Sequence, residues 1–73
     1  MLNRNIFLWR SALGYTQKEM AKFLAISQQA YSRKEKGLVP FTDKEKIIIK
    51  EELREYYPDI TIDDIFFSDN VLF

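Results

Sequence analysis

The polar side chains between residues 28 and 36 have the types and spacing needed to contact a nucleic acid. They are Gln28, Gln29, Ser32, Arg33 and Lys36, all within the stretch SQQAYSRKEKG. A helix turns by about 100° per residue, so these side chains would fall within about 140° of one another. Side-chain amides, hydroxyls and guanidinium groups hydrogen-bond to base edges, and ammonium groups pair with phosphates. The pattern therefore predicts a helix whose exposed face binds the major groove of double-stranded DNA.

The residue types also indicate which bases they would contact. Gln28 and Gln29 suit adenine and Arg33 suits guanine, each good bidentate pair discriminating by about 1–3 kcal/mol. The hydroxyl of Ser32 can serve either base, and Lys36 is a candidate for a phosphate. The alternative is that the two glutamines begin a solvated helix and that the lysine is an ordinary surface side chain.

Two short helices joined by a tight corner are predicted to position this face. Thr16 and Glu19 have the spacing of a capping box, so the first helix should begin directly after Thr16. Ser27 is expected to cap the second helix, which Gly37 would end. The small side chain of Ala21 would let the two helices approach closely. The inward side chains are expected to be Met20, Ala21, Leu24, Tyr31 and Glu35.

Three further helices would complete the domain. An apolar stripe predicts a helix over residues 3–13, before Gly14. A second capping box at Thr42 predicts a helix that continues to about Tyr57, and Thr61 would cap a short helix over residues 62–67. The expected inward side chains are Ile6, Trp9, Leu13, Ile49, Leu53, Tyr56, Ile62, Ile65 and Phe66. The fold class is therefore expected to be all-α: one compact five-helix domain over residues 1–67, followed by an apolar tail over residues 68–73.

The composition argues against several other classes of protein. With neither Cys nor His, the chain has no disulfides and no usual zinc site, and we expect no metal, cofactor or catalytic residue. No apolar run approaches the roughly 18 residues of a membrane span, and Arg4 and Arg10 interrupt any signal-peptide pattern. We therefore expect a cytoplasmic protein that is not an enzyme and does not bind a membrane.

The charge is distributed unevenly along the chain. The net charge is zero, yet residues 1–41 hold seven basic and two acidic side chains, whereas residues 42–73 hold four basic and nine acidic ones. This asymmetry predicts one face for a polyanion and another that is turned away from it.

Over residues 5–67 the sequence resembles the lambda-repressor-like family of helix-turn-helix DNA-binding domains. The segments over residues 41–45 and 61–67 are also similar to those of small regulators from phages and mobile elements. The residues that carry the family resemblance are Arg10, Leu13, Gly14, Thr16, Gln17, Met20, Ala21, Leu24, Ile26, Ser27, Gln28, Gln29, Tyr31, Ser32, Glu35 and Gly37.

The resemblance implies roles for these positions. Arg10 would form a structural salt bridge with the inward Glu35, and the start of the first helix of the pair would meet a phosphate. Base contacts would come from Gln28, Gln29, Ser32 and Arg33. Together with the general affinity of helix N-termini for anions, this gives the phosphate candidates Thr16, Gln17, Lys18, Lys22, Ser27 and Lys36.

The sequence departs from the family pattern at two positions of this motif. Ala25 stands where the corner often has glycine, and a positive φ there would cost on the order of 1 kcal/mol. Lys34 stands where an apolar residue is usual. Either its stem lines the edge of the core while its ammonium group reaches water, or it marks a modified helix end.

The resemblance implies a transcriptional regulator, expected to be a repressor, that binds a palindromic operator as a homodimer. The candidate dimer contacts are Phe66, Phe67, Val71, Leu72 and Phe73. Alternatively, the tail folds back on its own core or has no fixed partner. The alternative function, favoured by the acidic half, is a protein-interaction module such as an antirepressor, an antitoxin or an inhibitor.

Overall fold

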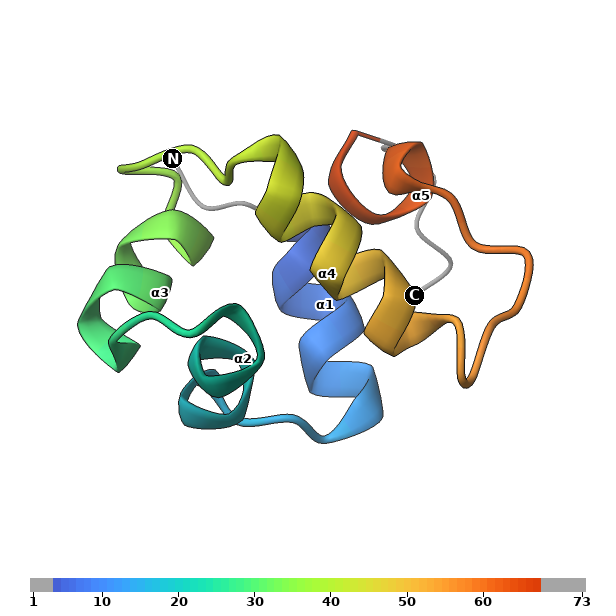
Figure 1. Cartoon of the computed structure of the whole chain (residues 1–73), viewed down its shortest axis with the longest axis horizontal. Helices are drawn as coiled ribbons and strands as arrows, with labels where there is room; N and C mark the ends of the chain where they lie inside the picture. Colours follow the sequence, from blue (N-terminus) through green and yellow to red (C-terminus); the bar gives the residue numbers. More distant parts are fainter. Residues whose placement is uncertain (1–3, 68–73) are drawn as a thin grey trace.

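The computed structural model describes residues 4–67 and is all-helical over that range (Figure 1). The five helices are α1 (Arg4–Leu13), α2 (Gln17–Leu24), α3 (Gln28–Glu35), α4 (Asp43–Leu53) and α5 (Ile62–Phe66). The expected class of fold, a compact all-α domain with five helices, is confirmed at this level. None of these helices has the length and apolar character needed to cross a membrane.

Side-chain caps define the starts of four helices, at the residues that the sequence predicts. Thr16, Ser27, Thr42 and Thr61 each accept a hydrogen bond from a backbone N–H in the first turn of the helix that follows. The three threonines belong to complete capping boxes, whose acidic partners are Glu19, Glu45 and Asp64. Because each box satisfies two backbone donors locally, these helix starts follow from short stretches of sequence.

The core draws on every helix and on two connecting segments. Its buried members are Ile6, Met20, Ala21, Leu24, Tyr31, Phe41, Ile49, Leu53, Ile60 and Ile65. Phe41 and Ile60 lie outside the helices, and the sequence pattern did not identify them as core residues. α1 packs against α5 and α3, while α4 packs against α2 and α5. As a result α2 and α3 form one end of the molecule and α5 forms the other (Figure 1).

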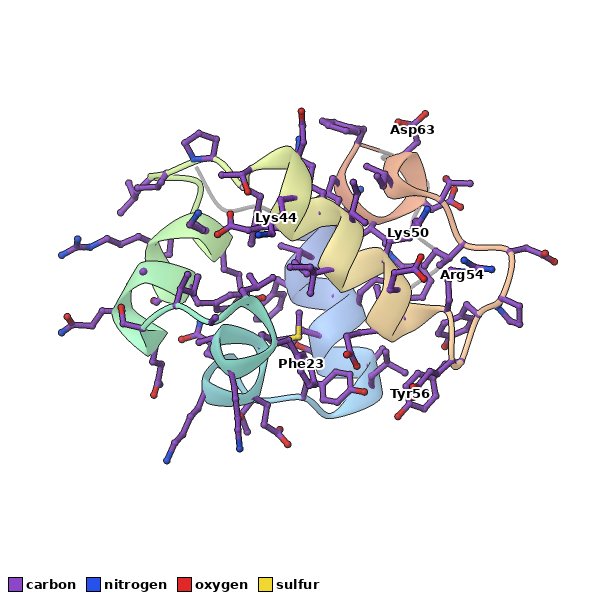
Figure 2. The ribbon with its side chains drawn as sticks, in the orientation of Figure 1. Phe23, Lys44, Lys50, Arg54, Tyr56 and Asp63 are labelled. Atoms are coloured by element: carbon purple, nitrogen blue, oxygen red, sulfur yellow. The ribbon has the colours of Figure 1, made fainter. Side chains whose placement is uncertain are left out.

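The predicted extent of α4 is wrong by about one turn. The helix ends at Leu53 and residues 54–56 form a turn, in which the backbone N–H of Tyr56 donates to the Leu53 carbonyl oxygen at 3.0 Å, the tighter i→i−3 spacing. Tyr56 is consequently 53% exposed instead of facing inward. Its hydroxyl lies 3.2 Å from that of Tyr15, so it joins a surface aromatic group that includes Phe23 (Figure 2).

Trp9 is half-buried and does not lie at the centre of the core. Its ring meets that of Tyr57 edge to face at 4.9 Å, and its indole N–H donates to the backbone oxygen of Asp64 at 3.3 Å. Trp9 therefore links α1 to α5 and to the segment that precedes α5. Ile62 and Phe66 are also only partly buried.

Candidate functional site

The outer side of α3 carries four exposed polar side chains without protein partners. Gln28, Gln29, Arg33 and Lys36 are all exposed, and Ser32 between them is half-buried. Within residues 4–67, none of these side chains makes a hydrogen bond or an ion pair. These groups are therefore free to bind a ligand without first breaking an internal contact.

The junction between α2 and α3 fixes how this face is presented. Ala25 has the left-handed conformation, with φ 56° and ψ 40°, and its N–H donates to the Lys22 oxygen at 3.2 Å. The N–H of Ile26 donates to the Ala21 oxygen at 3.0 Å. Ser27 then caps α3 by accepting from the Ala30 N–H at 3.0 Å. Ala25 therefore has the positive φ that the sequence analysis identified as a source of strain for a residue other than glycine.

A buried ion pair joins α3 to α1, between the two residues that the family resemblance pairs. Nε and Nη2 of Arg10 donate to the two carboxylate oxygens of Glu35 at 2.7 and 2.9 Å. The side chains are only 13% and 3% exposed, and Nη1 of Arg10 also donates to the Tyr15 oxygen at 2.9 Å. A bidentate pair of this kind fixes both distance and angle, so it sets the orientation of the end of α3.

Gln17 adds a contact to the same carboxylate. Its Nε2 donates to Oε1 of Glu35 at 3.1 Å, so its side chain is directed to the interior contact, while its backbone N–H remains in the first turn of α2. The sequence pointed to Gln17 only as a phosphate candidate, and nothing local indicated this second role. Tyr31 is fully buried beside the pair, and its hydroxyl has no partner in hydrogen-bonding geometry within residues 4–67.

The electrostatics of this cluster keep Glu35 ionised. Burial by itself would raise the pKa of Glu35, but the hydrogen bonds from Arg10 and Gln17 outweigh burial and lower that pKa below its ordinary value. The hydrogen bond between Arg10 and Glu35 also raises the pKa of Arg10. Burial raises the pKa of the Tyr31 hydroxyl. At neutral pH the inner side of α3 therefore holds a charged pair and a neutral phenol.

A second ion pair joins α3 to α4. Nζ of Lys34 lies 2.5 Å from Oε1 of Glu45, with side-chain exposures of 11% and 12%. The expectation that the Lys34 ammonium group reaches water is therefore wrong, because the carboxylate of a helix cap provides a closer partner. Burial would raise the pKa of Glu45, but the hydrogen bonds from Lys34 and the Thr42 backbone lower it. The sequence flagged Lys34 and the capping residue separately, without indicating that they meet.

α2 and its N-cap contribute further polar groups near α3. Lys18 and Lys22 are exposed and form no ion pair among the described residues. The hydroxyl oxygen of Thr16 is occupied as a cap, accepting from the Glu19 N–H at 3.0 Å, as Ser27 is at the start of α3. All predicted base and phosphate candidates thus lie on α2, α3 or their capping and flanking residues.

The α5 end of the molecule differs in character. The acidic residues Asp59, Asp63 and Asp64 are exposed there, and Figure 2 shows Asp63 at the far side from α3. Of the candidate dimer contacts, Phe66 is half-buried and packs against Phe41 at 5.4 Å between ring centroids. Phe67 is 61% exposed, with the Lys46 ammonium group 4.6 Å from its ring centroid. Val71, Leu72 and Phe73 lie outside the described residues.

No protein-family profile, curated protein or solved structure matches this chain. Residues 4–67 contain no group of three or more His, Cys, Asp or Glu side chains placed to hold a metal ion.

Proposed function

We propose that this protein is a sequence-specific DNA-binding domain in which α2 and α3 act as a helix-turn-helix of the lambda-repressor-like type. The observation that carries the proposal is the contrast across α3. Its outer side chains are exposed and unpaired, whereas its inner side is held by two ion pairs. A helix that is fixed in orientation and free on its outer side is what base recognition in the major groove requires.

The proposed contacts divide into two kinds. Gln28, Gln29, Ser32 and Arg33 would contact base edges, whereas Lys18, Lys22 and Lys36 would pair with phosphates. The backbone N–H groups in the first turns of α2 and α3 would also bind phosphates, since helix N-termini favour anions. The phosphate contacts would position the domain and supply its salt dependence, and the base contacts would supply specificity.

The biological role that fits such binding is transcriptional regulation. One α3 reaches only a few base pairs, so a homodimer on a palindromic operator, with half-sites one helical turn apart, is proposed. Repression would follow from occupation of a promoter by the bound dimer. Phe67, exposed at the α5 end, is the described residue proposed for the contact between copies.

Selection of binding sites from random duplex DNA tests the proposal. The chain should enrich a palindromic motif, and its affinity for that motif should fall steeply as salt concentration rises. Arg33→Ala serves as the matched variant and should enrich a motif that is degenerate at one position in each half-site. Recovery of unrelated sequences with no motif would contradict the proposal.

A second candidate, a protein-interaction module on the same fold, is favoured by the other end of the molecule. Tyr56 and Tyr57 are 53% and 41% exposed, next to a segment rich in acidic side chains. Exposed aromatic residues are common anchors of protein interfaces. A partner whose retention is lost in Tyr56→Ala, yet unchanged in Gln29→Ala and Arg33→Ala, would favour this function.

A further inference from the structure

The ion pair between Lys34 and Glu45 is the main polar link between α3 and α4. α3 packs against α2 and α1. Its restraint by the α4 side comes from this pair and from the edge-to-face contact of Tyr31 with Phe41, whose ring centroids lie 5.9 Å apart. Lys34 directly follows Arg33, one of the exposed residues on the outer side of α3.

One carboxylate oxygen serves two purposes at this link. Oε1 of Glu45 accepts the Lys34 ammonium group and also the backbone N–H of Thr42, at 2.9 Å. The second contact is half of the capping box that begins α4. The end of α3 is therefore tied to a rigid helix start, and the connector that runs from Lys36 to Phe41 is held at both ends.

We propose that Lys34 and Glu45 are positioning residues that set the orientation of α3 for base recognition; the proposal rests on the proposed DNA-binding function. Arg10 and Glu35 fix α3 relative to α1, and Lys34 and Glu45 fix it relative to α4. With both links in place, α3 cannot tilt about the α2–α3 junction. Loss of the second link changes the alignment of Arg33 and its neighbours with base edges, and so lowers specificity more than overall affinity.

The competing role for Lys34 is a direct phosphate contact, and Glu45→Gln separates the two. Gln at this position of a capping box can still accept the backbone N–H, so the start of α4 is retained while the charge pair is lost. If Lys34 acts only by its charge, Glu45→Gln should leave DNA affinity unchanged or increase it, with specificity unchanged. If the pair positions α3, Glu45→Gln should lower the specificity for the selected motif.

The experiment begins with the unaltered chain and the motif it selects from random DNA. If the unaltered chain selects no motif, the proposed function fails, and that failure is distinct from any result on the variants. With a motif in hand, dissociation constants are measured for the motif and for a duplex with one substituted base pair per half-site, at several salt concentrations. The specificity ratio is the dissociation constant for the substituted duplex divided by that for the motif. We expect Glu45→Gln and Lys34→Met each to lower this ratio by about tenfold, comparable to losing one base contact.

Two control variants make the result interpretable. Asp64→Asn makes the same kind of change in the capping box of α5, far from α3, and should leave the ratio unchanged. Lys36→Ala should weaken binding to both duplexes alike and reduce the salt slope by about one. Circular dichroism verifies folding, and if a single variant unfolds, the Lys34→Met/Glu45→Gln double variant, which leaves neither charge unpaired, replaces it.

A retained ratio in Glu45→Gln would overturn the positioning role. A retained ratio in Lys34→Met, with the salt slope reduced by about one, would assign Lys34 to a phosphate instead.

Discussion

The two sides of α3 carry similar charged residues, but within residues 4–67 only those on the inner side are paired with other helices. On the inner side, Glu35 and Lys34 each meet an oppositely charged side chain from another helix and are nearly excluded from solvent. On the outer side, Arg33 and Lys36 are exposed and have no protein partner among residues 4–67. The two sides of the helix therefore have different roles: the inner charges fix its orientation, and the outer charges remain available to a ligand. Changes on the inner side should affect stability first, and changes on the outer side should affect binding alone.

The largest effect is expected from breaking the inner side at Arg10. Arg10→Ala leaves the Glu35 carboxylate buried without its bidentate partner, which should cost about 3–5 kcal/mol of the free energy of unfolding. Urea denaturation measures this loss. Arg54→Ala is the matched control, because its ion pair with Glu51 is half exposed and should contribute less than about 1 kcal/mol. Equal losses in the two variants would remove the distinction between buried and exposed pairs.

Acid should weaken the inner side in the same direction. The pKa values of Glu35 and Glu45 are lowered in the folded chain. Their stabilisation is therefore complete above the unfolded value, about 4.3 for Glu, and is lost as pH falls through the lower folded values. Thermal unfolding between pH 7 and pH 2 measures this loss. Glu35→Gln should show a smaller change of stability across that range, and an unchanged pH dependence would contradict the account.

Arg33→Ala addresses the outer side and should leave stability within about 0.5 kcal/mol. Its effect should appear in DNA binding, as a loss of about 1–3 kcal/mol of discrimination at one base position. Affinities for a set of singly substituted duplexes measure this. A large loss of stability, or an even loss across all duplexes, would show that the two sides of α3 are not separate in function.

The junction between α2 and α3 should give the smallest effect. Ala25 has a positive φ and an exposed side chain, so Ala25→Gly removes backbone strain without opening a cavity. Stability should rise by up to about 1 kcal/mol, less the extra chain entropy that glycine gives the unfolded state. Ala12→Gly, in an exposed position of α1, is the control and should lower stability by about 1 kcal/mol.

The sequence predicted what depends on neighbouring residues and missed what depends on tertiary contacts. The starts of α2, α4 and α5 were predictable because a capping box spans only four residues, as at Thr16 and Glu19. The partner of Lys34 was not, because Glu45 reaches it across a connector whose path no local pattern specifies. The early end of α4 was missed for a similar reason: the turn that exposes Tyr56 interrupts an apolar spacing that would suit a longer helix.

The exposed face of α3 could be predicted from residue spacing, whereas the contacts behind it could not. Helical spacing alone places Gln28, Gln29 and Arg33 on one face, and the structure leaves that face exposed. Spacing could not predict the inward contact of Gln17 with Glu35, because the residue type does not show whether a side-chain amide points outward or toward the interior.

Chemical-shift mapping of the isotope-labelled chain with its selected duplex tests the central claim most directly. The account predicts that the largest changes fall on the side-chain amides of Gln28 and Gln29 and on the backbone of residues 16–36. It also predicts smaller changes at residues 51–64, which would arise only from the contact with the second copy on the palindromic duplex. Changes concentrated on residues 51–64, with the amides of Gln28 and Gln29 unaffected, would contradict it.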